Sequence, residues 1–191
     1  MKKSIILSVL LLLFISIIGF GQITITKSDG GSVVVKLGLG SKINEKSTLT
    51  RQLIVLNDAK CPLQIDEGAG IFVTYNSTNV SFYNKSEITP TEPINAYEIH
   101  YVIYDVFGSH IKTLSGTDVQ DIVSKTRIGG GWYANENQVS EYLFCVSYVA
   151  KVRTKSGVVW FYNPDIIKEE LNKIQINYEE NYKPKEKPET I

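Results

Sequence analysis

Along most of the chain, hydrophobic residues recur with a period of two, which is the spacing of a β-strand and not of a helix. The clearest example is EYLFCVSYVAKVR at residues 141–153, where the even-numbered positions are apolar and the odd-numbered positions are mixed. We expect the even-numbered set to face the core and the odd-numbered set to be partly wet. The turn TKSG and the apolar VVWFY come next, so residues 141–162 predict a β-hairpin.

Further strands are predicted wherever the same short apolar runs are separated by turn residues. The candidate segments are SVVVKLGL, LTRQLIVL, IFVTYN and VSFYN, and the turn clusters between them include SDGGS, NDAKCP and ITPTEP. Short strands at this spacing, without helices between them, predict an all-β fold and specifically an antiparallel β-sandwich.

Residues 97–116, YEIHYVIYDVFGSHIKTLSG, hold both histidines of the chain and therefore raise the question of an active site. The alternation of residues favours a hairpin with Gly108 in its turn. In a hairpin with a two-residue loop, Asp105 lies opposite His110, and His100 lies roughly 15–20 Å from His110. At that distance the two imidazoles share neither a metal ion nor a proton-transfer path. We interpret the segment as a structural hairpin.

The segment YVIYDVFG within this hairpin resembles the motif of the FxLYD family of small, mostly exported prokaryotic domains. Tyr101 and Ile103 stand at the Phe and Leu positions, Tyr104 and Asp105 match directly, and Gly108 falls at the glycine of the family's turn. The resemblance covers about residues 70 to 160 and implies an immunoglobulin-like β-sandwich. It implies no catalytic residue. The chain departs from the family in its GGGWY segment and in its long strand at 139–152.

The N-terminus has the order of charge, apolar run and small residues that is typical of a secretory signal peptide. Two lysines precede an apolar run at residues 5–18, and Gly19 and Gly21 occupy the −3 and −1 positions of a cut before Gln22. The alternative is a membrane anchor, but the run is shorter than the ~20 residues that a spanning helix needs. We therefore predict a signal peptide at 1–21 and an exported, periplasmic or extracellular protein with no membrane span after cleavage.

The mature chain is close to neutral, because removing the two N-terminal lysines leaves 18 basic and 20 acidic residues. A near-neutral chain without a basic stripe is not expected to bind nucleic acid. Residues 22–60 are expected to add strands to the same sandwich or to form an extension, and 61–176 to form the sandwich core and a C-terminal helix. The last segment, 177–191, is rich in Lys, Glu and Pro and predicts a disordered charged tail.

The C-terminal helix is predicted from NPDIIKEELNKI, in which Asn163 is the expected N-cap and Pro164 the first helical residue. Its apolar residues, Ile166, Ile167, Leu171 and Ile174, fall along one face. So short a helix is marginal alone, and we expect this face to be buried against the sandwich or against something else.

The two cysteines, Cys61 and Cys145, leave two interpretations open. In an exported chain they could form a disulfide that closes a long loop. Equally, they could be two buried thiols that never meet, because the sequence does not place their Cα atoms within bonding distance. Neither has a neighbouring base or a CxxC partner, so neither is predicted to be a nucleophile.

The candidate binding residues are aromatic: Trp132 and Tyr133 in one group, and Trp160 and Tyr162, with Phe161 between them, in the other. Adjacent strand residues point to opposite faces, so one member of each group must face away from the core. They either form a binding surface or lie under the C-terminal helix. Gly129–Gly131 lacks the lysine and helix of a phosphate-binding loop and is read as a bulge or a close-approach strand. No catalytic, metal or cofactor site is predicted.

These observations predict an exported, non-catalytic binding or scaffold module of the bacterial periplasm or cell surface that engages a protein partner through a sheet face or edge strand. The alternative is a module that binds a glycan or small ligand through exposed aromatic residues. An enzyme is the third possibility, but the sequence contains no catalytic motif that would support it.

Overall fold

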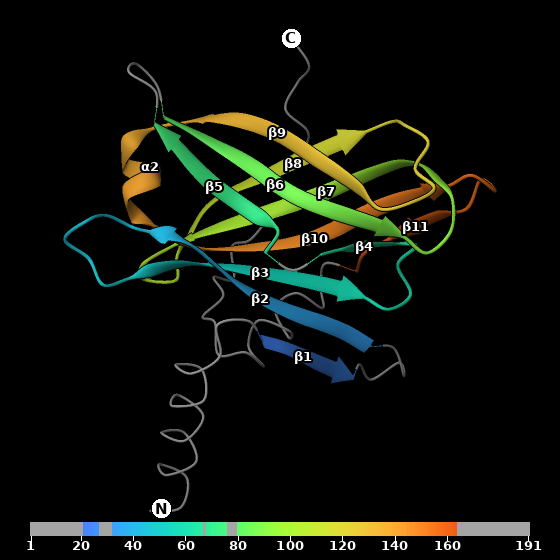
Figure 1. Cartoon of the computed structure of the whole chain (residues 1–191), viewed down its shortest axis with the longest axis horizontal. Helices are drawn as coiled ribbons and strands as arrows, with labels where there is room; N and C mark the ends of the chain where they lie inside the picture. The colour runs from blue at the N-terminus through green and yellow to red at the C-terminus, as the bar shows by residue number, and fades with distance from the viewer. Residues whose placement is uncertain (1–20, 27–31, 67, 76–79, 164–191) are drawn as a thin grey trace, which may run out of the picture.

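Two β-sheets pack face to face, with a short helix at one end (Figure 1). This computed structural model describes residues 21–26, 32–66, 68–75 and 80–163. The predicted all-β sandwich is confirmed. The predicted signal peptide up to residue 20, the C-terminal helix beyond its N-cap and the charged tail lie outside the described residues. Within the described part of the chain, no helix is long and apolar enough to cross a membrane.

The larger sheet carries the N-terminal strands at one edge and β8 at the other. Its order is β1 (Gly21–Thr26), β2 (Ser32–Lys42), β3 (Thr50–Asp58), β10 (Tyr142–Thr154), β7 (Ile94–Asp105) and β8 (His110–Asp118), with β11 (Val159–Phe161) also paired to β10. The pairs are antiparallel except for β3 with β10, which is parallel. The expectation of an antiparallel sandwich therefore misses this one pair.

The smaller sheet is built around β6. Its strands are β4 (Leu63–Ile65), β5 (Gly70–Tyr75), β6 (Val80–Pro90) and β9 (Thr126–Ala134), and β4, β5 and β9 all pair with β6. From β5 to β11 the strands follow the order A, B, C, C′, E, F and G of an immunoglobulin-type sandwich, with β5-β6-β9 facing β11-β10-β7-β8. The free edges β8 and β9 consequently lie on the two sheets at one side of the sandwich.

The core between the sheets contains aliphatic and aromatic side chains from both. Its fully buried members include Leu53, Ile71, Phe82, Ile99, Tyr101, Ile103, Tyr142 and Cys145. A second cluster lies on the other face of the larger sheet and contains Val33, Val35, Ile54, Leu56, Val102, Tyr104, Phe144, Val146, Tyr148 and Tyr162. The larger sheet is therefore apolar on both faces, whereas a strand with one wet face was expected.

Strand β10 corrects the prediction that its even-numbered residues alone form the core. Cys145 and Val149 face the smaller sheet, whereas Phe144, Val146 and Tyr148 belong to the cluster on the opposite face. Register shifts between Tyr142 and Phe144, and between Val149 and Lys151, reverse the alternation at both ends of the strand. When a central strand is buried on both faces, its sequence does not show which face packs against the other sheet.

A short helix, α2 (Glu136–Glu141), precedes β10 and was not predicted. Asn135 caps it by accepting a hydrogen bond from the backbone N–H of Gln138 at 2.8 Å, in a capping box. The guanidinium of Arg51 donates to the Val139 carbonyl at 3.0 Å and lies over the Tyr142 ring. A buried arginine thus ties the helix to β3.

The histidine-bearing segment forms the predicted hairpin between β7 and β8. Asp105 Oδ1 accepts hydrogen bonds at 2.8 Å from the backbone N–H groups of Phe107 and Ser109, and Gly108 has a φ of 86°. The loop is wider than two residues, so His110 lies opposite Tyr104 and not opposite Asp105 as expected. The Asp and Gly of the FxLYD-like motif therefore stabilise a turn.

Candidate functional site

The two predicted aromatic residues of β9 point to opposite sides of the smaller sheet. Trp132 faces inward, with its ring 5.7 Å from the ring of Tyr101 between centroids. Tyr133 is 81% exposed. The expected alternation of these neighbours is present, and Trp132 is the member that lies beside a cavity.

The other predicted pair lies elsewhere. Tyr162 is buried against Tyr148 at a centroid distance of 4.8 Å, and Trp160 packs edge-on against Tyr162. Strand β11 carries Trp160 in the larger sheet, whereas β9 carries Trp132 in the smaller one. The four candidate residues therefore do not form one binding surface.

Cys61 and Cys145 are both buried free thiols in the structure. Burial raises the pKa of each thiol to about 12. Each stays protonated at neutral pH, and a protonated, buried thiol is a poor nucleophile.

The two histidines have separate partners. His100 lies 2.7 Å from a carboxylate oxygen of Glu98 through Nε2 and 3.1 Å from the Tyr148 hydroxyl through Nδ1. His110 lies 2.9 Å from the Thr113 hydroxyl through Nε2. They do not converge on one site, and no group of three potential metal ligands occurs among the residues that the structure describes.

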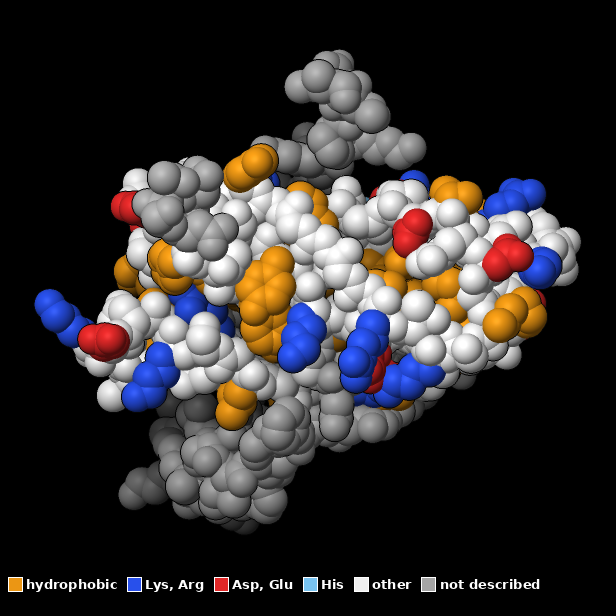
Figure 2. All heavy atoms as spheres, turned by 45° about the horizontal axis from the view of Figure 1, so that its top comes forward, with side chains coloured by type: hydrophobic (Ala, Val, Ile, Leu, Met, Phe, Trp, Pro, Cys, Tyr) orange, Lys and Arg blue, Asp and Glu red, His pale blue; other side chains and the backbone are white. Residues whose placement is uncertain are grey.

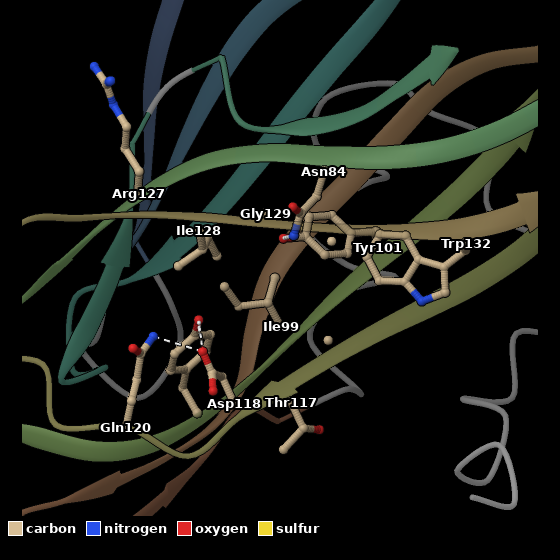
Figure 3. Close-up of a pocket in the computed structure, with 13 residues that line it drawn as sticks. Asn84, Ile99, Tyr101, Thr117, Asp118, Gln120, Arg127, Ile128, Gly129 and Trp132 are labelled. Atoms are coloured by element: carbon tan, nitrogen blue, oxygen red, sulfur yellow. Dashed lines mark hydrogen bonds between the residues drawn. The ribbon is translucent and has the colours of Figure 1, made fainter. Parts of the chain in front are cut away.

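A cavity of about 290 Å³ opens between the edge strands β8 and β9, where the two sheets diverge (Figure 3). We call it the edge groove. Its lining includes Asn84, Tyr97, Tyr101, Asp118, Gly130 and Trp132. Strand β6 supplies Asn84 and β7 supplies the two tyrosines, while the remaining residues come from the free edges. The sandwich core is thus reachable from its open side.

Two glycines, one on each edge strand, keep the edge groove open because they have no side chains to fill it. A Cβ atom added to Gly130 would meet Trp132 at 3.9 Å, and one added to Gly116 would meet the same ring at 3.8 Å. Apart from the chain neighbours of each glycine, no other atom of the described residues lies within 4 Å of either Cβ position. Strand β9 pairs with β6 without a register shift through Gly129–Gly131. The glycine run is therefore a regular strand without side chains, not a bulge.

Asn84 forms part of the floor of the edge groove and has an unused acceptor. Its Nδ2 donates to the Tyr101 hydroxyl at 2.8 Å. Asn84 is only 8% exposed, and its Oδ1 is buried without a hydrogen-bond partner among the described residues. An unpaired buried amide oxygen costs stability, so its retention needs an explanation.

The polar groups at the mouth of the edge groove are held by neighbours. Asp118 Oδ2 accepts hydrogen bonds from Gln120 Nε2 at 2.7 Å and from the Tyr97 hydroxyl at 3.4 Å. Burial, and then the Asp118 charge, raise the pKa of Tyr97 to about 12. Arg127, on the opposite side, pairs with Glu87 at 2.8 Å. The groove therefore has one negative and one positive residue.

A second, larger hollow of about 400 Å³ is bordered by the charged residues of β6 and β9. Lys125 lies 2.7 Å from both Asp66 and Glu87, and its hydrogen bonds, with that of Arg127, lower the pKa of Glu87 to about 2. Because these charged groups pair with one another, this hollow presents fewer free polar groups to a ligand than the edge groove does.

Of the edge-groove residues, sequence reasoning identified Trp132. It missed Asn84, Tyr97, Gly116 and Asp118, which lie on three different strands, β6, β7 and β8, and meet through the strand order. The signal that was present is the glycine run before Trp132, since glycine within a strand marks close approach of another group.

Comparisons with known proteins identify no family for the chain. No family model matches it, and no curated protein matches it. Among solved structures there is a similarity to a crystal structure of a DUF1425 family member from Shewanella sp. pv-4. The TM-score is 0.30 and the identity 8%, over 66% of this chain and 93% of the other. This similarity is too low to assign the family.

Proposed function

We propose that the protein is an exported, non-catalytic binding module of the bacterial envelope and that the edge groove is its ligand site. Export is supported by the signal-peptide pattern at residues 1–21 and by the resemblance of residues 101–108 to the FxLYD motif of exported domains. The observation that carries the ligand site is the buried, unpaired Oδ1 of Asn84 at the floor of the edge groove.

Binding without catalysis suits the groups that line the groove. Burial raises the pKa of Tyr101 to about 12, as it does that of Tyr97, so both hydroxyls stay protonated at neutral pH. Both also take part in hydrogen bonds within the protein. A general base or nucleophile needs to be poised for proton transfer, and neither tyrosine is.

A compact ligand group fits this site better than the flat surface of a protein partner. Stable protein interfaces bury about 800 Å² on each side, and an apolar centre is typical of them. On the face shown in Figure 2, the hydrophobic side chains of the described residues form separate small patches among polar and charged ones. Small ligands, in contrast, bind in concave sites with a few directed polar groups. We therefore place the ligand-binding alternative ahead of the protein partner expected from the sequence.

The test is a thermal-shift screen of the full chain, expressed with its own signal sequence and purified, against monosaccharides, amino acids, and small oligosaccharides and peptides. We expect at least one compound to raise the Tm of the wild type and of Gly131→Ala, but not of Gly130→Leu. Gly130→Leu fills the edge groove, while a Cβ on Gly131 meets the Phe82 carbonyl at 3.6 Å outside it. Equal shifts in Gly130→Leu and the wild type would place the ligand elsewhere and contradict the proposal.

A further inference from the structure

We infer that the ligand group of the edge groove is a neutral sugar ring. This inference rests on the proposed function and specifies its ligand class. It follows from the charge of the groove, from its hydrogen-bonding groups and from the aromatic wall formed by Trp132.

The charges favour an uncharged ligand. Asp118 and Arg127 stand on opposite sides of the groove mouth and carry opposite charges. Asp118 is engaged by Gln120 and Tyr97, and Arg127 is engaged by Glu87. Because the lining carries one charge of each sign, the groove has no net charge that would select a cation or an anion.

The hydrogen-bonding groups favour a ligand with hydroxyl groups. Asn84 Oδ1 has no donor among the described residues, so a hydroxyl group of a ligand that reaches it would satisfy it. The indole N–H of Trp132, which is also part of the lining, is a donor only and takes an acceptor. A hydroxyl group both donates and accepts, so neighbouring hydroxyls on one ring can serve sites of either kind.

The walls favour a ring with one apolar face. The six-membered ring of Trp132 borders the space above Gly116 and Gly130, and Tyr101 lies next to it (Figure 3). A pyranose presents C–H groups on one face and hydroxyls at its rim. The aromatic π-face attracts the partly positive C–H hydrogens, and the rim reaches the polar groups of the floor and mouth.

The experiment uses the full chain with Trp160→Phe, so that fluorescence reports Trp132 alone of the two tryptophans. Trp160 does not line the edge groove. The probes are an array of neutral oligosaccharides, followed by titration with the best of them, and in parallel a set of capped hexapeptides with Lys, Gln or Ser at the centre.

We expect a neutral saccharide to change the Trp132 fluorescence saturably. Binding should be about tenfold weaker in Asn84→Leu, which removes one buried acceptor, and lost in Gly130→Leu. Gly131→Ala is the matched control and should bind like the parent. No response to any neutral saccharide would overturn the inference, and so would equal saccharide affinities in the parent and Gly130→Leu.

The peptide titration separates this inference from the proposed function. If a hexapeptide binds to the parent but not to Gly130→Leu, and no saccharide binds, the sugar inference is overturned and the edge groove remains a ligand site. Absence of Gly130-dependent binding for saccharides and peptides alike would overturn both.

Discussion

Asn84 on β6 lies directly opposite Gly130 on β9, so a buried amide faces a position that has no side chain. The pair helps to explain the cavity, because a side chain at 130 would extend beside Trp132, while the neighbouring Gly129 lies next to the unpaired Oδ1, which a Cβ there would approach at 3.9 Å. Proteins accept such a local loss of stability where binding requires it.

Replacing Asn84 by Leu should change the free energy of unfolding by less than about 1 kcal/mol, because the lost hydrogen bond to Tyr101 is offset by removing the unpaired oxygen. The matched control is Asn57→Leu. Asn57 is equally buried but bonds the Ile65 carbonyl at 2.6 Å and the Ile65 N–H at 2.8 Å. That variant should lose about 2 kcal/mol or more, since the Ile65 N–H becomes unpaired and the Ile65 carbonyl keeps only the bond from Lys36 Nζ at 3.2 Å. Urea denaturation measures both, and equal losses would contradict the role given to Asn84.

Glu98 should make the stability of the protein depend on pH. Burial raises its pKa, but hydrogen bonds with Lys151 and His100 outweigh burial and lower it overall. A lowered folded-state pKa contributes stability that is present above the unfolded value of ~4.3 and is lost as the pH falls through the folded value. Between pH 5 and pH 3 the wild type should therefore lose more unfolding free energy than Glu98→Gln. Identical losses in the two proteins would contradict this assignment.

The thiols of Cys61 and Cys145 should be inert in the folded protein. Both are buried and protonated, and the thiolate is the reactive form. We expect Ellman's reagent to detect no thiol in native protein and two after unfolding in guanidinium chloride without a reductant. Detecting none after unfolding would show that the cysteines are bridged in the exported protein.

Asp105 should stabilise the fold without contributing to ligand binding. Replacement by Ala removes the acceptor for two backbone N–H groups in the β7–β8 turn and should cost about 1–2 kcal/mol. Asp105→Asn keeps a side-chain oxygen and should cost less. If Asp105→Ala instead weakened binding of the thermal-shift ligand at a temperature where it is fully folded, the motif would have a direct role in binding.

The exported protein should begin at Gln22. N-terminal sequencing of protein recovered from the periplasm or medium checks this, and Gly21→Leu should slow processing because the −1 position requires a small residue. Recovery of the intact N-terminus in the membrane fraction would indicate an uncleaved anchor.

Much of the fold could be predicted from the sequence because strand alternation and turn residues act locally. Residues 97–116 and 141–162 form hairpins as expected, each with a glycine at positive φ in its turn. The core face of β10 could not be predicted, since both faces are apolar and register shifts at its ends reverse the alternation. Trp132 was identified because aromatic side chains are conspicuous. Asn84 was not, because an unpaired amide becomes visible when its surroundings are known.

The parallel pairing of β3 with β10 has a consequence for when the molecule can fold. The two strands are about ninety residues apart, and β10 is also the strand that joins β3 to β7. A chain that emerges from the ribosome or a translocation channel N-terminus first therefore presents β2 and β3 long before their neighbour exists. Closing such a long loop is slow, and the early strands keep an open edge while they wait. Residues 32–58 are thus where a chaperone would protect the nascent protein most effectively.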